Sequence, residues 1–304
     1  MGRGVQLFMQ LMAAPSPSSL SLGPIRLVVA DVAGASAFYE RVIGLRPLPG
    51  DDGSVRLHAG GDPAGPALVE LVPDASALPR ARHSSGLFHL ALLVPDRRAL
   101  AQALRRVVTA SWRLDGASDH LVSEALYLSD PEGNGIELYR DRPRAEWRRG
   151  EHGELAMATL PLDLDDLVRE LVDAPEQDAG MPAGTTLGHV HLQVADLDAA
   201  EAFYAGALGF DVMVRGYPGA LFVAADGYHH HLGLNTWSSA GGPAADPATR
   251  GLRDFAIRYP SAEARDAIAA RVAGAGYALH ADGEDHVATD PFGIAVRLTV
   301  DPPR

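Results

Sequence analysis

Apolar residues along this chain follow two spacings, one typical of strands and one typical of helices. A short apolar run ends just before Asp31, which can cap a helix, and Gly44 can end that helix in a left-handed conformation. The apolar face between them consists of Ala35, Phe38 and Val42. Several short apolar stretches, separated by Gly, Pro and Asp, then predict further strands. The pattern therefore predicts one strand, one helix and several strands in succession.

This pattern recurs because the chain contains an internal duplication. Residues 29–45 and 194–210 share Val-Ala-Asp, Ala-Phe-Tyr and Gly at the same spacing, with an offset of 165 residues. Residues 86–95 and 251–260 show the same offset. Each half holds two units of similar length, which we call modules 1 and 2 in the first half and modules 3 and 4 in the second. The sequence therefore predicts four βαβββ modules.

Shifts in composition divide the chain into segments. Residues 142–185 are rich in Pro, Gly and charged side chains, as is typical of a linker, although residues 162–172 predict one short helix. The apolar stretch near the N-terminus is interrupted by two Gln residues, so we interpret it as disordered rather than as a signal peptide. The predicted segments are a disordered N-terminal segment over 1–22, an N-terminal domain (modules 1 and 2) over 23–141, the linker over 142–185 and a C-terminal domain (modules 3 and 4) over 186–304.

Charge and missing residue types exclude several functions. The 304 residues include 39 acidic and 26 basic side chains, for a formal net charge of -13 without any basic run, so nucleic acid and anionic membranes are not expected as partners. The chain has no cysteine, which excludes disulfides, thiolate metal sites and cysteine nucleophiles. It also has no lysine, which excludes Schiff-base chemistry. His, Asp and Glu remain as the strong metal ligands. We expect the protein to be cytoplasmic.

Four stretches of sequence carry a resemblance to a known superfamily. They are the Ala-Phe-Tyr helix at 37–39, the segment 116–127, the Asp-Pro-x-Gly-Asn-x-x-Glu strand at 130–137 and the His-rich segment 227–237. With the fourfold module, they resemble the vicinal oxygen chelate superfamily, which includes glyoxalase I, bleomycin-resistance proteins and extradiol dioxygenases. The similarity is greatest to bacterial catechol 2,3-dioxygenases of the four-module type. It implies an α+β fold, with four βαβββ modules in two tandem vicinal-oxygen-chelate domains.

In that superfamily, metal ligands come from the first and the last strand of each module. The register of the resemblance places these residues at the first-strand position: Pro24, His89, His189 and Asp254. It places these at the last-strand position: Glu70, Glu137, Leu234 or Asn235, and Arg297. Modules 2 and 3 together supply His89, Glu137 and His189, the two-His-one-Glu set of extradiol enzymes, which leaves room on Fe(II) for a catecholate and dioxygen. We therefore predict that module 2 pairs with module 3, and module 1 with module 4.

The resemblance implies catalytic roles for three further residues. Tyr127 lies ten positions before Glu137, the spacing between the substrate-binding tyrosine and the glutamate ligand in extradiol enzymes. His120 falls where those enzymes place another histidine near the metal. His230 best matches their acid-base histidine, which lies in a Gly-x-His-His strand.

Other histidines near these residues have simpler interpretations. Because neighbouring residues of a strand point to opposite faces, at most two of the three histidines at 229–231 can share a face. His191 lies two residues beyond His189, and we expect it to point away from the metal.

These residues imply an Fe(II)-dependent extradiol dioxygenase. It would insert both atoms of O2 into catechol or a small substituted catechol and form a 2-hydroxymuconic semialdehyde-type product. Mn(II) is an alternative metal, because the same ligand set accepts it. The expected partners are the catechol and O2, and we expect a homo-oligomer, which is common in the family.

Two alternatives within the superfamily stay open at this point. One is a glyoxalase-like or fosfomycin-resistance-like metalloenzyme that uses Glu70, His89 and Glu137 from modules 1 and 2 around Ni(II), Zn(II) or Mn(II). The other is a non-catalytic binding protein of the bleomycin-resistance type. The first alternative differs from the dioxygenase by one ligand, Glu70 in place of His189.

Overall fold

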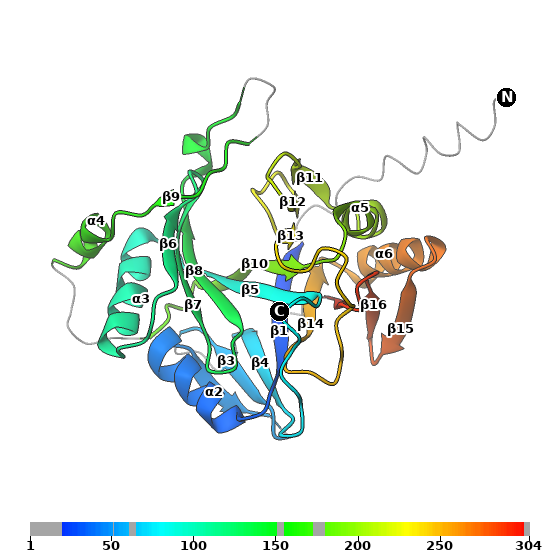
Figure 1. Cartoon of the computed structure of the whole chain (residues 1–304), viewed down its shortest axis with the longest axis horizontal. Helices are drawn as coiled ribbons and strands as arrows, with labels where there is room; N and C mark the ends of the chain where they lie inside the picture. The colour runs from blue at the N-terminus through cyan, green and yellow to red at the C-terminus, as the bar shows by residue number, and fades with distance from the viewer. Residues whose placement is uncertain (1–19, 51, 61–64, 151–154, 173–179, 301–304) are drawn as a thin grey trace.

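The strands of this protein form two large mixed sheets (Figure 1). The computed structural model describes residues 20–50, 52–60, 65–150, 155–172 and 180–300. Each of the four modules has one strand, one helix and three strands in that order, so the predicted α+β fold of βαβββ modules is confirmed.

The elements of each module are as follows. Module 1 consists of β1 (Ser21–Val29), α2 (Val32–Phe38), β2 (Arg46–Pro49), β3 (Val55–His58) and β4 (Ala67–Pro73). Module 2 consists of β5 (Gly86–Leu93), α3 (Arg97–Thr109), β6 (Gly116–Asp119), β7 (Ser123–Ser129) and β8 (Gly135–Asp141). Module 3 consists of β10 (Thr186–Gln193), α5 (Leu197–Glu201), β11 (Asp211–Val214), β12 (Ala220–Ala224) and β13 (Leu232–Asn235). Module 4 consists of β14 (Gly251–Tyr259), α6 (Ala262–Gly274), β15 (Ala278–Asp282), β16 (Asp285–Thr289) and β17 (Ala295–Val300).

Each sheet joins modules from opposite halves of the chain. The eight-stranded sheet has the order β15-β16-β17-β14-β1-β4-β3-β2, which combines modules 1 and 4. The nine-stranded sheet has the order β11-β12-β13-β10-β5-β8-β7-β6-β9, which combines modules 2 and 3 and adds β9 (Leu160–Pro161) from the linker. The first strands of the paired modules are antiparallel neighbours at the centre of each sheet. The predicted pairing of modules is therefore confirmed, and neither half of the sequence builds a sheet by itself.

The helices of modules 1 and 3 begin and end where the sequence predicts. Asp31 accepts a hydrogen bond from the Gly34 amide at 2.9 Å, and Asp196 accepts one from the Ala199 amide at 2.7 Å. Both helices continue into a wider π-helical turn, over 39–43 and 202–207. The following Gly44 and Gly209 have φ values of 89° and 87°, a conformation that glycine adopts without strain.

The N-terminal segment and the linker differ in part from the prediction. Ser21 and Leu22 belong to β1, so the predicted disordered segment 1–22 overlaps the first strand, and residues 1–19 lie outside the described part of the chain. The predicted linker helix is present as α4 (Leu164–Val168) with a 3₁₀ turn over Arg169–Leu171. Residues 151–154 and 173–179 of the linker also lie outside the described part.

The helices flank the sheets on opposite sides of the molecule. Helices α2 and α3 lie at one side of Figure 1, and α5 and α6 lie at the other. Among the described residues, no helix combines the length and the apolar character needed to cross a membrane.

Candidate metal centre

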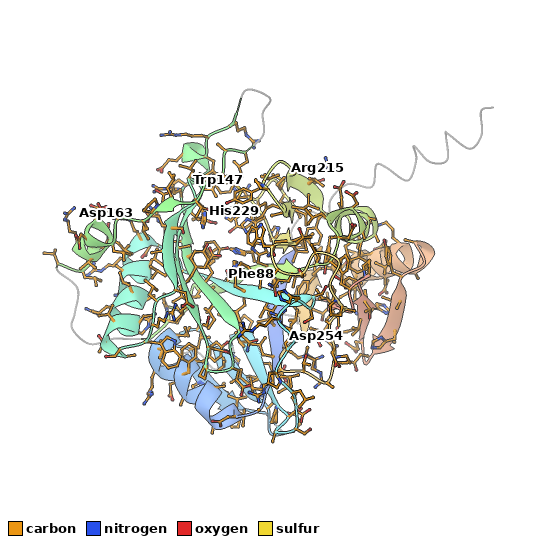
Figure 2. All side chains as sticks on the ribbon, in the orientation of Figure 1. Phe88, Trp147, Asp163, Arg215, His229 and Asp254 are labelled. Carbon is orange, nitrogen blue, oxygen red and sulfur yellow. The ribbon has the colours of Figure 1, made fainter. Side chains whose placement is uncertain are left out.

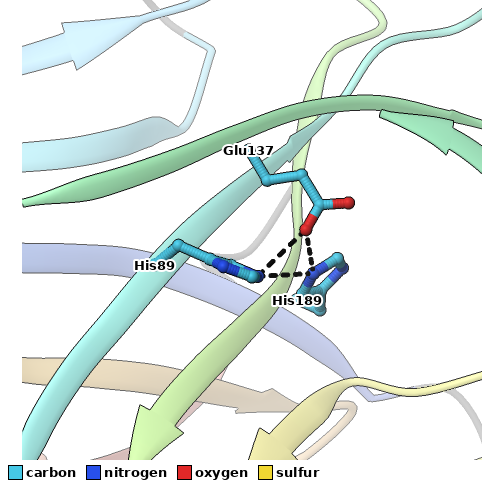
Figure 3. A group of neighbouring side chains, drawn as sticks. All are labelled: His89, Glu137 and His189. Atoms are coloured by element: carbon cyan, nitrogen blue, oxygen red, sulfur yellow. Dashed lines mark hydrogen bonds and ion pairs between the residues drawn. The ribbon is translucent and has the colours of Figure 1, made fainter. Parts of the chain in front are cut away.

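Three side chains on neighbouring central strands of the nine-stranded sheet meet at one point (Figure 3). His189 lies on β10, His89 on β5 and Glu137 on β8, and all three are buried. Glu137 Oε2 lies 2.9 Å from His89 Nε2 and 3.0 Å from His189 Nε2, and the two imidazole nitrogens are 3.3 Å apart. The structure thus brings together the three residues predicted as metal ligands.

These separations fit a shared metal ion. Ligand bonds of about 2.1 Å at right angles place donor atoms about 3.0 Å apart, close to the observed 2.9, 3.0 and 3.3 Å. Hydrogen bonds alone would require both imidazoles to aim an N–H at the same carboxylate oxygen, with the two hydrogens facing each other. Two imidazole nitrogens and one carboxylate oxygen are the donors of two-His-one-carboxylate Fe(II) sites. The described residues therefore form a site that could hold a divalent metal ion.

The electrostatics of this group keep the carboxylate ionised. Burial by itself would raise the pKa of Glu137, but its interactions with His189 and His89, including a hydrogen bond to each, outweigh burial and hold that pKa well below its ordinary value. Burial lowers the pKa of His189, which favours the neutral imidazole. An ionised carboxylate beside neutral imidazoles is the protonation state in which these groups bind metals.

A cavity of about 270 Å³ opens next to the three candidate ligands. This volume is slightly below the common range for ligand pockets, about 300–1,000 Å³, so the cavity suits a ligand of about one ring. Its mouth is aromatic: Phe88 is 37% exposed and Trp237 47% exposed, and their ring centres lie 5.3 Å apart. Figure 2 shows Phe88 near the centre of the molecule. Tyr217 and Phe222 complete the aromatic lining.

All three predicted catalytic residues line this cavity. The ring of His230 packs against that of His189, with centroids 4.2 Å apart. Tyr127 Oη lies 2.6 Å from His120 Nε2, and His120 Nδ1 lies 2.7 Å from the Ala158 carbonyl oxygen. Because a carbonyl only accepts, neutral His120 carries its proton on Nδ1, and Tyr127 donates to Nε2. Burial, and then the negative charge of Glu137, raises the pKa of Tyr127 well above its ordinary value, so its hydroxyl stays protonated.

The prediction that the consecutive histidines lie on a strand was wrong. Residues 225–231 form a loop between β12 and β13, so strand alternation does not govern them. The three side chains point in three directions: His230 faces the cavity, His229 contacts Asp141, and His231 Nδ1 accepts the Ala225 amide. The choice of His230 as the residue that faces the cavity agrees with the structure, although the argument from alternation does not apply.

The expectation that His191 points away from the site was also wrong. Residues two apart on a strand share a face, so His191 follows His189 into the same cavity. Its ring centre lies 4.9 Å from that of His89 and 5.4 Å from that of Trp237. Burial lowers the pKa of His191 well below its ordinary value, so it presents a neutral imidazole.

Corresponding positions in the eight-stranded sheet form an ion-pair cluster. Arg26 pairs with Asp254 in the register in which His191 pairs with His89. Arg26 forms an ion pair with Asp254, and Arg297 Nε lies 3.7 Å from the same carboxylate. Glu70 lies on β4 of this sheet, whereas His89 and Glu137 lie in the other sheet, so the described residues do not form the Glu70-containing ligand set of the glyoxalase-like alternative.

Comparisons with known proteins agree with this architecture. Residues 21–138 and 186–298 match the model of the Glyoxalase/Bleomycin resistance protein/Dioxygenase superfamily. The chain is 41% identical over 276 residues to a Bacillus subtilis protein named catechol-2,3-dioxygenase, with 90% of this chain and 95% of that protein covered.

Two solved structures have a similar fold. A Bacillus subtilis protein provisionally named a dioxygenase superposes with a TM-score of 0.64 at 14% identity, covering 96% of this chain and 87% of that one. Glyoxalase I from Zea mays superposes with a TM-score of 0.57 at 16% identity, covering 93% and 92%. The match to the family model over both halves, together with the 41% identity, shows that this chain belongs to the Glyoxalase/Bleomycin resistance protein/Dioxygenase superfamily.

Proposed function

We propose that this protein is an Fe(II)-dependent extradiol dioxygenase that cleaves catechol or a small substituted catechol. The observation that carries the proposal is the meeting of His89, Glu137 and His189 at one wall of a ring-sized cavity that His230 and Tyr127 also line. The name of the Bacillus subtilis relative, catechol-2,3-dioxygenase, supports the same substrate class. A cytoplasmic location and a homo-oligomeric state stay predictions from the sequence.

The two histidines and the glutamate would hold the metal. When bound, Fe(II) supplies open coordination positions at which a catecholate and dioxygen can be brought together. The buried carboxylate offsets part of the positive charge of the ion, and burial lowers the pKa of His189, which favours its neutral form.

The surrounding side chains would orient the catechol and manage its protons. His230 is a neutral imidazole, because burial and the nearby histidines lower its pKa well below the ordinary value, so it can accept a proton from a catechol hydroxyl and later return it. The Tyr127 hydroxyl donates a hydrogen bond to His120, so its oxygen can still accept a hydrogen bond from the substrate. Phe222 and Phe88 cover the ring from solvent.

The reaction needs no further reductant. One ring carbon–carbon bond breaks, both atoms of O2 are incorporated, and the electrons that reduce O2 come from the catechol ring. The product is a 2-hydroxymuconic semialdehyde-type compound, and protons taken up by His230 return to it.

Oxygen consumption tests the proposal directly. Protein loaded with Fe(II) without air is mixed with catechol while O2 uptake and the visible spectrum are followed. We expect one O2 per catechol and a yellow ring-opened product. Absence of uptake with catechol, methylcatechols and chlorocatechols, despite tightly bound iron, would overturn the proposal in favour of glyoxalase-like or binding functions.

A further inference from the structure

A chain of hydrogen bonds links His230 to the last residue of β8. His230 Nδ1 lies 2.8 Å from His229 Nδ1, and His229 Nε2 lies 2.8 Å from Asp141 Oδ1. The other carboxylate oxygen of Asp141 accepts the Tyr228 hydroxyl at 2.9 Å. The loop of module 3 that carries His230 is thus anchored to module 2.

The directions of the hydrogen bonds in this series are fixed when Asp141 is ionised and His229 is neutral. An ionised Asp141 can only accept hydrogen bonds. The bond between Asp141 and His229 therefore requires a proton on His229 Nε2. With His229 neutral, its Nδ1 has a lone pair and accepts from His230 Nδ1. His230 then carries its proton on Nδ1, and its Nε2 is left as the unprotonated nitrogen.

The surroundings hold His229 in this position. Its side chain is fully buried, and its ring lies 4.0 Å from the Tyr228 ring and 5.4 Å from the Trp147 ring, measured between centroids. Figure 2 shows His229 and Trp147 close together. Tyr139 hydrogen-bonds to Tyr228 at 2.8 Å, and its ring also lies 4.8 Å from that of His189, measured between centroids.

We propose that Asp141 and His229 are positioning residues that fix the tautomer of His230, so that its Nε2 is the proton acceptor in the cavity. This inference rests on the proposed function only for the role of His230 in the reaction. The tautomer itself follows from the hydrogen bonds and can be tested without turnover.

The same series of hydrogen bonds determines which residue carries the positive charge after a proton has been accepted from the catechol. As a catechol O–H proton binds to His230 Nε2, the His230 Nδ1 proton can pass to His229 Nδ1. The positive charge then rests on His229 next to Asp141, and the ring centroid of His229 lies 6.4 Å from that of His189, compared with 4.2 Å for His230. When the proton returns to the product, both transfers reverse, so no proton is gained or lost.

Nitrogen NMR of 15N-histidine-labelled protein tests the tautomer, because the shifts of imidazole nitrogens distinguish protonated from unprotonated positions. Zn(II)-loaded protein is suitable, since Zn(II) accepts the same donors and is diamagnetic. We expect His230 to carry its proton on Nδ1 and His229 on Nε2. A proton on His230 Nε2 would overturn the inference, whether or not the protein cleaves catechol.

Substitutions at 229 separate positioning from packing. His229→Phe keeps a ring but removes the acceptor, and His229→Asn restores an oxygen acceptor near the Nδ1 position. We expect the His230 tautomer preference to be lost in His229→Phe and kept in His229→Asn. The matched control is His231→Asn, at a neighbouring histidine outside the cavity, which should leave the His230 spectrum unchanged.

Kinetics provide the second readout. We expect His229→Phe to lower kcat by about 100-fold or more with little change in KM, the effect of impairing a general base, with His229→Asn intermediate. Wild-type-like kcat in His229→Phe would refute the positioning role if the wild type cleaves catechol. A wild type that consumes no O2 refutes the proposed function instead, and the NMR result still decides the tautomer.

Discussion

Tyr204 donates a hydrogen bond to Asp290 at 2.9 Å and thereby ties the helical segment of module 3 to the last turn of module 4. The other two oxygen contacts of this buried carboxyl are the amides of Phe292 and Ile294, each at 2.8 Å. Tyr39 and Asp130 form the equivalent bond between modules 1 and 2 at 3.2 Å. In each half, the tyrosine of the Ala-Phe-Tyr motif and the aspartate of the Asp-Pro turn therefore connect the two sheets.

Asp290 should make stability fall as pH rises. Burial raises its pKa from 3.8 to about 6 in the folded protein, against partial lowering by its hydrogen bonds. Between these values the folded state binds the proton and the unfolded state does not, so unfolding becomes easier as pH increases from about 4 to about 6. The effect is about 3 kcal/mol, at about 1.4 kcal/mol per tenfold change in acidity.

Asp290→Asn removes this ionisation, so the decline of unfolding free energy that it causes between pH 4 and pH 7 should disappear. Urea denaturation across this pH range measures it. Asp198→Asn, at an exposed carboxyl of α5, is the control and should keep the wild-type slope. A wild-type slope in Asp290→Asn as well would show that Asp290 is ionised at low cost in the folded protein.

Metal binding should depend on His189 and not on Glu70. Removing one of three ligands should weaken Fe(II) or Zn(II) binding by more than the factor of about 10–100 seen when only supporting hydrogen bonds around a metal are lost. Calorimetric titration and metal analysis of His189→Ala and Glu70→Ala measure this difference. Loss of binding in Glu70→Ala with retention in His189→Ala would place the site in the first half of the chain.

The ion-pair cluster of the other sheet should contribute to stability alone. Asp254→Ala leaves Arg26 and Arg297 close together without the carboxylate between them. Breaking a buried pair costs about 3–5 kcal/mol, and because both arginines are partly exposed we expect about 2 kcal/mol here. Chemical denaturation should show this loss while metal content stays at the wild-type level. A loss of metal would instead mean that this sheet takes part in the site.

The cavity should discriminate against negatively charged catechols. None of the described residues that line it is an arginine, and the chain has no lysine, so a carboxylate on the ring would have no cationic partner. We expect kcat/KM for 3,4-dihydroxybenzoate to be at least about 100-fold below that for 4-methylcatechol, from the cost of an unpaired buried charge. Steady-state O2 uptake with both substrates checks this, and equal values would contradict it.

The resemblance to the superfamily, applied to the repeated modules, was sufficient to select the three candidate ligands that the structure brings together. His89 and His189 lie at the same place in their modules, and only modules 2 and 3 combine such histidines with a suitable Glu137, which also led to the correct pairing of modules. The chemistry of the ligand set thus predicted a long-range contact that periodicity alone does not show.

The hydrogen-bond chain behind His230 could not be read in the same way. Asp141 and His229 are 88 residues apart and meet only after β8 and the loop before β13 are placed in one sheet. The three consecutive histidines were expected on a strand because the family resemblance places the acid-base histidine in a Gly-x-His-His strand, but the backbone turns at Gly227, whose φ of 64° ends the regular alternation. An acidic residue at the end of the ligand-bearing strand, together with a histidine beside the predicted acid-base residue, was the available signal.

The crossed pairing of modules also sets the order in which a ribosome-bound chain can fold. When the first half has emerged, β1 and β5 each have a partner on one side, but their other edges wait for β14 and β10. Two central apolar strands thus stay unpaired at one edge during synthesis, a state prone to aggregation. The candidate metal centre, which needs His189 on β10, cannot be completed until the second half has begun to leave the exit tunnel.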